Sequence, residues 1–304
     1  MLAGRPQLVC VAGGSGFVGR ELVNRLVRAG HSVRLLTRHE AHAGPLRLLP
    51  LVELHIGSYD DDAFLRQALS GANVIINLVG ILNERGRSGA GFRRAHVELT
   101  EQLLRAAVAA QARRFLLMSA LRADAASGAS HYLRSKGAAE QRVLAHADRI
   151  DYTIFRPSVI FGKEDSLTNR FASLLRLSRG PMPLARASTR FAPIHVGDVA
   201  EAFMRALHGG DTSAQTYELC GAETLSLAEL VQQVARARQL PCHVLAMPDA
   251  LGWLQAAVLE FLPGKPLSLD NFRSLLTDNV CREDGCARLG IRPQRLSTWL
   301  AASD

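Results

Sequence analysis

The sequence contains no uninterrupted apolar run long enough to span a bilayer, although apolar residues make up 48% of its 304 residues. Nor does it begin like a signal peptide, because a short apolar stretch after one arginine passes directly into glycines. We therefore expect a cytoplasmic protein, with peripheral attachment to the inner membrane as the alternative.

Lysine is scarce: the 36 basic residues include only Lys136, Lys163 and Lys265, which leaves 33 arginines. Aromatic residues make up 6% of the chain, and no aromatic-rich basic stripe accompanies the net charge of +8. The sequence therefore does not predict nucleic-acid binding. Attraction to anionic ligands, acidic partners or anionic lipid is compatible with the charge.

Cysteine is also sparse. The five cysteines are odd in number, scattered, and not accompanied by histidines at zinc-binding spacing. We expect reduced structural thiols and no metal site.

What the sequence does contain is a regular alternation of apolar strands and helical patterns through its first half. Strands are predicted at Leu8–Ala12, Ser32–Thr37, Val52–Gly57, Val74–Val79, Arg114–Ser119 and Tyr152–Phe161, and helices at Phe17–Ala29, Ala63–Leu69, Phe92–Ala110 and Tyr132–His146. Strands that are apolar on both faces and alternate with helices predict an α/β fold, a Rossmann-type doubly wound parallel sheet.

The second half is more mixed and predicts a smaller α/β lobe. Its helices are expected at Leu167–Leu177, Val196–Leu207, Leu227–Ala237, Ala250–Leu262 and Leu269–Thr277, and its strands at Thr216–Cys220 and His243–Met247. No proline- or serine-rich linker separates the halves. We expect residues 1–165 to form a dinucleotide-binding lobe and residues 166–304 a substrate or partner lobe packed on it, with some chain crossover.

A glycine-rich loop follows the first strand and begins the first helix. In the segment Val9–Arg20 the spacing is G-x-x-G-x-x-G, with glycines at positions 13, 16 and 19. Such a loop allows a tight turn, close approach of a pyrophosphate to backbone N–H groups, and close packing of helix on strand. It predicts dinucleotide binding by Gly13, Ser15, Gly16, Phe17, Val18 and Gly19.

The end of the second strand indicates which dinucleotide is bound. Leu36, Thr37 and Arg38 occupy the place where sites that prefer NAD usually have an acid for the ribose hydroxyls. An arginine there suits a ribose 2′-phosphate, because guanidinium binds phosphate oxygens through two hydrogen bonds. The sequence favours NADP(H), with NAD(H) as the alternative and Thr37 and Arg38 as cofactor-binding residues.

Tyr132 and Lys136 are the candidate acid–base pair. Residues four apart share one face of a helix, and a nearby ammonium is expected to lower the pKa of a phenol from its usual value of about 10. Ser119 ends a buried strand at the carboxyl edge of the sheet, where ligands of α/β proteins bind. We predict Ser119, Tyr132 and Lys136 as the catalytic residues.

These segments together resemble the short-chain dehydrogenase/reductase superfamily, in its atypical branch that contains the NADPH-binding accessory subunit nine of mitochondrial complex I. The resemblance covers nearly the whole chain, on the phrases GGSGFVGR at 13–20, YLRSKGAAE at 132–140, FRPSVIFGKED at 155–165, APIHVGDVAEAF at 192–203 and LSLDNFRSLLTDN at 267–279.

The resemblance implies further cofactor contacts. Pro157, Ser158 and Val159 should pass near the nicotinamide, and Leu78, Val79 and Gly80 near the adenosine ribose. Where many relatives have Gly-Asp for the adenine, this chain has Gly57 followed by Ser58, which still offers a hydrogen-bonding group.

The leading hypothesis is an NADP(H)-dependent oxidoreductase acting on a carbonyl, alcohol or quinone. Relatives are associated with respiratory complex I or quinone chemistry, and some hold NADPH without evident turnover. A non-catalytic accessory or assembly protein of a respiratory complex is therefore the second hypothesis. A nucleotide-sugar epimerase or dehydratase, which shares the loop and the Tyr/Lys pair, is the third.

Two further features receive structural interpretations. In the helix Ala250–Leu262, Leu251, Leu254, Val258, Phe261 and Leu262 recur at helical spacing, which favours a core face over a membrane-bound one. His195 precedes Asp198 at a helix start, and we expect it to cap or hydrogen-bond there.

Overall fold

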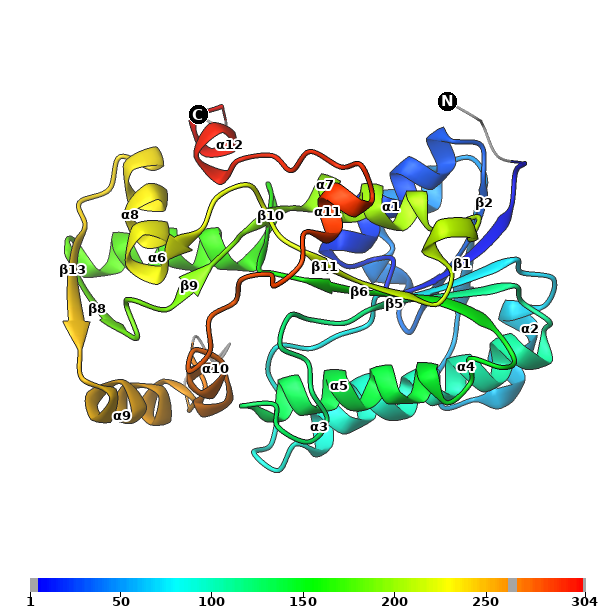
Figure 1. Ribbon diagram of the computed structural model, residues 1–304, viewed down its shortest axis with the longest axis horizontal. Helices are drawn as coiled ribbons and strands as arrows, with labels where there is room; N and C mark the ends of the chain where they lie inside the picture. Colours follow the sequence, from blue (N-terminus) through cyan, green and yellow to red (C-terminus); the bar gives the residue numbers. More distant parts are fainter. Residues whose placement is uncertain (1–4, 262–266, 303–304) are drawn as a thin grey trace.

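The computed structural model describes residues 5–261 and 267–302. Its centre is a seven-stranded, all-parallel sheet in the order β3-β2-β1-β4-β5-β6-β11 (Figure 1). These strands are β1 Leu8–Ala12, β2 Ser32–Thr37, β3 Val52–Ile56, β4 Val74–Asn77, β5 Arg114–Met118, β6 Asp151–Pro157 and β11 Gln215–Leu219. This confirms the predicted Rossmann-type sheet.

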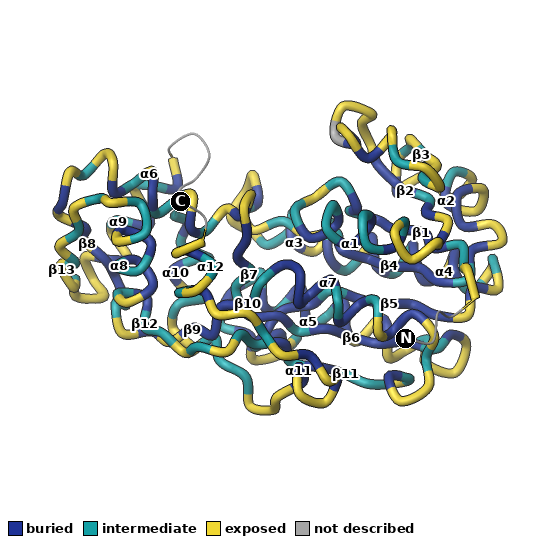
Figure 2. The backbone as a smooth tube through the Cα atoms, turned by 90° about the horizontal axis from the view of Figure 1, so that it is seen from above, coloured by how far each residue is buried: buried dark blue, intermediate teal, exposed yellow. Residues whose placement is uncertain are grey.

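Helices cover both faces of the sheet, because alternate residues of its inner strands are apolar on each side. Val9 and Val11 of β1 pack with α1 (Phe17–Arg28) and α7 (Val196–Arg205). Cys10 and Ala12 face the opposite way. That second face is covered by α2 (Asp62–Leu69), α4 (Leu99–Ala109) and α5 (His131–Leu144), and the sheet lies between the two layers as a buried band (Figure 2).

A smaller group of elements lies beside the sheet, at the left of Figure 1. Its members are α6 (Ser166–Ser178), α8 (Leu227–Ala237), α9 (Asp249–Leu259), α10 (Leu269–Ser274) and the paired strands β8 (Pro181–Ala185) with β13 (His243–Met247) and β9 (Arg190–Phe191) with β12 (Leu225–Ser226). Short α11 (Gly285–Arg288) and α12 (Leu296–Ala301) follow. Since β11 and α7 belong to the main sheet and its helices, the chain crosses between the two groups of elements. The division into lobes of residues 1–165 and 166–304 stays a prediction.

Most predicted elements match the structure within three residues, but two do not. The predicted strand Tyr152–Phe161 is divided into β6 and β7 (Ile160–Phe161), and β7 pairs with β10 (Ile194–His195) outside the main sheet. The predicted helix Phe92–Ala110 is divided into α3 (Ala90–Phe92), the π-helical turn η3 (Arg93–Glu98) and α4.

Cysteine pairing differs from the prediction of reduced thiols throughout. Cys220, after β11, forms a disulfide with Cys281, which is 61 residues further along the chain. Cys10, Cys242 and Cys286 are free. The number of cysteines does not reveal that two of the five form a disulfide, because the bond depends on which two loops the fold brings together.

The exposure of α9 also corrects a prediction. Leu251, Leu254, Val258 and Phe261 were expected to face a core, yet each is more than half exposed. The buried side of the helix is formed instead by small residues, Gly252 and Ala256. Leu262 lies outside the described residues. Within the described part of the chain, no helix has both the length and the apolar character needed to cross a membrane.

Candidate functional site

The glycine loop packs tightly between β1 and α1. Gly13 has a φ of +78°, and a Cβ on it would lie 2.9 Å from the amide nitrogen of Val79. A Cβ on Gly19 would overlap the backbone of Gly14, so helix and loop approach each other as closely as the spacing predicted. The amide of Gly16 donates to the carbonyl of Gly13 at 3.0 Å and closes the turn.

The start of α1 is open toward solvent and suits an anion. Gly16 is the N-cap residue, and no side chain caps it within the described residues. The first turn also has no acidic side chain. The backbone N–H groups near Ser15, Phe17 and Val18 therefore offer donors and the positive end of a helix dipole. This arrangement fits the pyrophosphate of a dinucleotide.

The end of β2 carries the residues predicted for the adenosine half. Arg38 is exposed and forms no ion pair within residues 5–261 and 267–302. The Thr37 hydroxyl donates to the carbonyl of His39 at 3.0 Å, and the Ser58 hydroxyl accepts from the Asp60 amide at 3.2 Å. Arg38 is thus the group of this set whose charge is available to a ligand.

Tyr59 was not predicted for this region. Its hydroxyl donates to the carbonyl of Leu36 at 2.9 Å. Burial raises the pKa of Tyr59 to about 12, opposed by its neighbours Gly13 and Arg38. The side chain therefore fills the space between the glycine loop and the end of β2 as a neutral phenol.

The loop after β4 connects the glycine loop to the candidate catalytic helix. Leu78 and Val79 lie against Gly13, and a Cβ on Gly80 would lie 3.2 Å from the Nζ of Lys136. The three residues predicted here thus lie between the two halves of the site. Their predicted contact with the adenosine ribose stays a prediction.

Ser119 and Lys136 meet at the carboxyl end of β5. Lys136 is 3% exposed, and its Nζ donates to the carbonyl of Met118 at 3.0 Å. Ser119, also 3% exposed, follows immediately, and its Oγ has no hydrogen-bond partner among the described residues. A buried hydroxyl without a partner is uncommon in folded proteins, and it leaves a hydrogen bond that a ligand or a water molecule can complete.

Burial controls the protonation of the pair on α5. It lowers the pKa of Lys136 to about 8, opposed by the carboxylate of Glu140. It raises the pKa of Tyr132 to about 12. The predicted lowering of the Tyr132 pKa is therefore wrong for this structure, because desolvation of the phenol dominates and the Lys136 ammonium is held by Met118.

His96 is a residue of this site that the sequence did not suggest. It lies on the π turn η3 and is almost fully buried. Its Nε2 accepts from the amide of Ile81 at 3.1 Å, so its Nδ1 carries the proton and donates to the Ser135 hydroxyl at 2.8 Å. Burial, together with the charge of Lys136, lowers the pKa of His96 to about 2. His96 is therefore a neutral link between the loop after β4 and α5.

The ring of Tyr132 is held by aromatic neighbours. It meets the rings of His96 and Phe92 edge to face, with centroids 5.6 and 6.0 Å away. The backbone amides of His131 and Tyr132 donate to the carboxylate of Asp270, on α10, at 2.7 and 3.0 Å. A residue far along the chain thus fixes the start of α5.

A second distant residue, Asn279, covers the segment predicted to approach the nicotinamide. Its side-chain oxygen accepts from the Ser158 hydroxyl at 2.6 Å and from the Val159 amide at 3.2 Å. Pro157 ends β6 immediately before them. Asp270 and Asn279 both lie in the segment 267–279 that the family resemblance singled out. Contacts over more than a hundred residues leave no local signal, however, so the sequence did not indicate which residues these two would hold.

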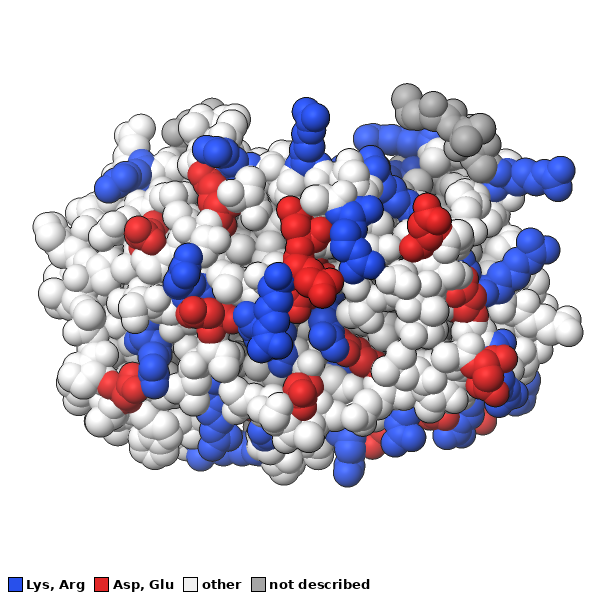
Figure 3. Space-filling view, in the orientation of Figure 1, with Lys and Arg blue, Asp and Glu red and all other residues white. Residues whose placement is uncertain are grey.

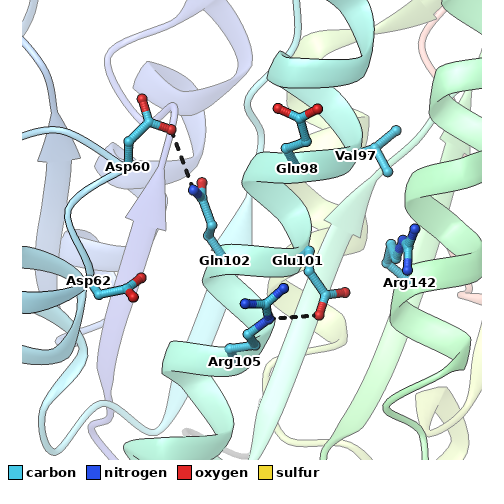
Figure 4. A pocket seen from close by; sticks show the side chains of 8 residues that line it. All are labelled: Asp60, Asp62, Val97, Glu98, Glu101, Gln102, Arg105 and Arg142. Atoms are coloured by element: carbon cyan, nitrogen blue, oxygen red, sulfur yellow. Dashed lines mark hydrogen bonds and ion pairs between the residues drawn. The ribbon is translucent and has the colours of Figure 1, made fainter.

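Two hollows lie near these elements. A groove of about 470 Å³ runs between the start of α2 and the outer sides of α4 and α5, and its lining is mainly charged, including Asp60, Glu98 and Arg105 (Figure 4). A smaller cavity of about 130 Å³ is lined by residues that include Phe92, His131 and Arg273. The smaller cavity, beside Tyr132, is the one that adjoins the candidate site.

His195 lies outside the site and has the structural role that was expected. As the N-cap residue of α7, it accepts from the amide of Gly197 through Nδ1 at 3.2 Å. Among the described residues, no group of three or more His, Cys, Asp or Glu side chains could hold a metal ion.

Comparison with known proteins places this geometry in a family. Residues 13–208 match the model of a family described as NAD(P)H-binding. The chain is 31% identical over 294 residues to subunit 9 of the NADH dehydrogenase [ubiquinone] 1 alpha subcomplex of Arabidopsis thaliana, covering 90% of this chain and 71% of that protein. It spans only 59% of the corresponding rat protein.

Other relatives and structures agree with this assignment. A ceramide reductase of Caulobacter vibrioides is 35% identical over 194 residues, covering 64% of this chain and 58% of that protein. The UDP-glucose 4-epimerase of Thermotoga maritima has the same fold, with a TM-score of 0.75 at 15% identity over 97% of this chain and 96% of its own. These matches confirm the resemblance that the sequence motifs indicated.

Proposed function

The chain belongs to the NAD(P)H-binding family that includes the subunit 9 proteins of NADH dehydrogenase, and from this premise we propose that it is an NADPH-dependent carbonyl reductase. The observation that carries the proposal is the buried, unpartnered hydroxyl of Ser119 beside Lys136 and α5. A substrate carbonyl oxygen would accept the hydrogen bond that Ser119 lacks.

Protonation of the site favours the reductive direction. With a pKa raised to about 12, Tyr132 is a neutral phenol at physiological pH and can donate a proton to an oxygen that gains negative charge. When bound, the nicotinamide supplies the hydride to the carbonyl carbon. Lys136 would hold the ribose hydroxyls and stabilise the phenolate that remains after proton transfer.

The preference for NADPH over NADH rests on Arg38. Arg38 is exposed directly after β2 and, like Gly13 of the glycine loop, is a neighbour of Tyr59. A ribose 2′-phosphate bound there would provide oxygens for two hydrogen bonds. Thr37, Ser58 and the loop from Leu78 to Gly80 complete the proposed adenosine site. Pro157, Ser158 and Val159 complete the proposed nicotinamide site.

The names of the relatives suggest the kind of substrate. One is a subunit of a ubiquinone-reducing enzyme and another is named a ceramide reductase. Ubiquinone and ceramide both carry long hydrocarbon portions. We therefore propose a carbonyl or quinone on a lipophilic molecule as the substrate.

The proposal is tested in two steps with purified protein. First, the nucleotide that it carries is released and identified by mass; NADPH or NADP is expected, whereas tightly held NAD would favour an epimerase. Second, NADPH oxidation is followed with lipophilic ketones and quinones for the wild type and Tyr132→Phe. The variant should lose about a hundredfold in rate. Equal rates would contradict the assigned role of Tyr132.

A second candidate function is that of a non-catalytic subunit that holds NADPH and docks on a membrane-bound respiratory complex. The observation that favours it is the exposed apolar side of α9, on a chain related to complex I subunits. It predicts NADPH that is retained through purification, no oxidation of any carbonyl or quinone, and co-purification with membrane subunits. Oxidation lost in Tyr132→Phe would contradict it.

A further inference from the structure

The outward side of α9 is apolar over its whole length. Its exposed side chains are Leu251 (53%), Trp253 (50%), Leu254 (54%), Val258 (59%) and, just beyond the helix end, Phe261 (78%). Between Asp249 and Glu260 the helix has no charged residue. Single exposed apolar side chains are ordinary, but four on one helix and a fifth just beyond its end mark a surface that binds something.

The opposite side of α9 fixes how the helix is presented. A Cβ on Gly252 would overlap the Ala185 side chain and lie 2.9 Å from the Phe272 ring, so the helix packs through its smallest residues. The large side chains are thereby turned away from the protein. The surface over α9, at the lower left of Figure 3, is mostly free of charged side chains.

Cations border this surface, and the acids near it are already engaged. The Arg87 guanidinium lies 4.7 Å above the Phe261 ring, and the exposed Arg273 lines the same cavity as Arg87 and Glu260. Of the nearby acids, Asp270 accepts the amides at the start of α5, and Glu260 pairs with Arg87 at 3.4 Å.

The two remaining acids are engaged as well. Asp249 pairs with Arg186 at 2.5 Å. Glu84 accepts from the amides of Gly89 and Gly91 at 2.7 and 2.8 Å. These acids keep their negative charge, and the Arg87–Glu260 and Arg186–Asp249 pairs offset each other. The attraction to an anionic surface therefore comes from the net charge of +8 on the chain, with the exposed Arg273 at the border of the apolar surface.

This chemistry favours a bilayer over a protein partner. The cores of protein interfaces are bordered by polar groups that form directed hydrogen bonds. Between Leu251 and Leu259 the described side chains of α9 include no charged group, and only Gln255 and the indole N–H of Trp253 offer such bonds. An apolar helix side with a tryptophan and bordering arginines is instead the pattern of a helix that lies in the interface of an anionic membrane.

The α9 surface also adjoins the entrance to the candidate site. Glu260, at the end of α9, lines the 130 Å³ cavity together with Leu269, Arg87 and Phe92. The Phe92 ring in turn contacts the Tyr132 ring edge to face. A molecule that leaves the bilayer beside α9 would therefore meet a short route to Tyr132.

We propose that the apolar side of α9 docks on an anionic lipid bilayer and places the cavity beside Tyr132 at the membrane surface, where it admits a membrane-dissolved carbonyl substrate. The second half of this statement rests on the proposed reductase function. The docking itself does not.

The docking is tested by the fluorescence of Trp253. Trp299 is the other tryptophan of the chain, so Trp299→Phe gives a protein with a single reporter on α9. With vesicles of phosphatidylglycerol, the emission should shift to shorter wavelength and be quenched by brominated lipid, and the protein should sediment with the vesicles. With phosphatidylcholine vesicles binding should be much weaker, because these lipids carry no net charge to attract the positively charged protein.

Substitution of the apolar side provides the specific comparison. Leu254→Glu should weaken vesicle binding at least about tenfold, since it places a negative charge where an apolar side chain would enter the bilayer. Leu48→Glu changes a leucine that is even more exposed (80%), next to β3 at the other end of the molecule, and should leave binding unchanged. Failure of the parent protein to bind either vesicle, or equal binding by Leu254→Glu, would overturn the proposal.

Two further outcomes are separated by additional measurements. Light scattering without vesicles should give the same mass for wild type and Leu254→Glu; a dimer that this substitution dissociates would show that a second copy covers α9 and would overturn the proposal. NADPH affinity should be equal in both proteins. If vesicle binding is confirmed but no ketone in the vesicles is reduced, the reductase function fails while the docking stands.

Discussion

At the scale of single residues, the candidate site combines one unpartnered hydroxyl with two groups whose pKa values burial has shifted. The sequence predicted Ser119, Tyr132 and Lys136 as a set, because strand ends and helical spacing bring such residues to one edge of a sheet. It did not predict the direction of the Tyr132 shift. The spacing indicates that Tyr132 and Lys136 lie on the same side of a helix. It does not indicate how far each side chain is exposed to solvent, or that the Met118 carbonyl accepts the hydrogen bond of the ammonium.

The buried ammonium of Lys136 should reduce stability below pH 8. Its pKa is lowered from 10.5 to about 8 in the folded protein, so between these values the unfolded chain binds a proton that the folded protein has lost. Wild-type stability should therefore rise with pH across this window, by roughly 3 kcal/mol relative to Lys136→Met. Urea unfolding of both proteins at several pH values measures this difference. If the free energy of unfolding changed with pH in the same way in both proteins, the burial of the Lys136 ammonium would be contradicted.

Arg38 should determine the choice of cofactor. Arg38→Asp should weaken NADPH binding at least about tenfold and leave NADH binding unchanged or stronger, because only NADPH carries the phosphate that the guanidinium would bind. Calorimetric titration with both nucleotides measures the effect. Arg47→Asp, a change of another exposed arginine nearby, is the control. An equal loss for both nucleotides would argue against this role.

At the scale of elements, periodicity predicted most strands and helices but not where a helix departs from regular winding. The segment Phe92–Ala110 has the pattern of one helix, yet Arg93–Glu98 forms a π turn that places His96 in the site. A π turn adds a residue without changing composition, so periodicity does not reveal it. For α9, periodicity identified the apolar side correctly but could not indicate what covers it.

The glycine loop provides a direct test of packing at this scale. Gly13→Ala should cost about 2 kcal/mol more stability than Gly30→Ala and should abolish NADPH binding. Both glycines have φ near +80°, but a Cβ on Gly13 would meet the loop after β4, whereas one on Gly30 has nothing within 4 Å. Chemical unfolding and NADPH titration compare the two. Equal losses would mean that the positive φ alone, and not the close approach, requires glycine at position 13.

At the scale of the whole molecule, the sequence predicted the sheet and its family but not the connections that close the chain on itself. Asp270 and Asn279 reach α5 and the segment after β6, and Cys281 follows on the same stretch. Each partner is far away in the chain, so only the folded arrangement of the two groups of elements reveals the contact. The C-terminal stretch thus covers the end of the site that is proposed for the nicotinamide.

The disulfide should stabilise this closure. Cys281→Ser should lower the free energy of unfolding by about 2–4 kcal/mol, because the bond restricts the unfolded chain. Cys242→Ser, which changes a free and partly exposed thiol, should have little effect. Thermal unfolding with and without reductant compares the proteins, and reductant should shift the wild type but not Cys281→Ser. A wild type that is insensitive to reductant would contradict the bond's contribution.

The most direct test of the account is to follow the hydride itself. Wild-type protein is incubated with a lipophilic ketone and NADPH deuterated at the transferable position of nicotinamide C4, and the product alcohol is analysed by mass spectrometry. We predict deuterium on the former carbonyl carbon with the wild type and about a hundredfold less product with Tyr132→Phe at equal NADPH affinity. Absence of labelled alcohol from the wild type, or an equal yield from the variant, would contradict hydride transfer at this site.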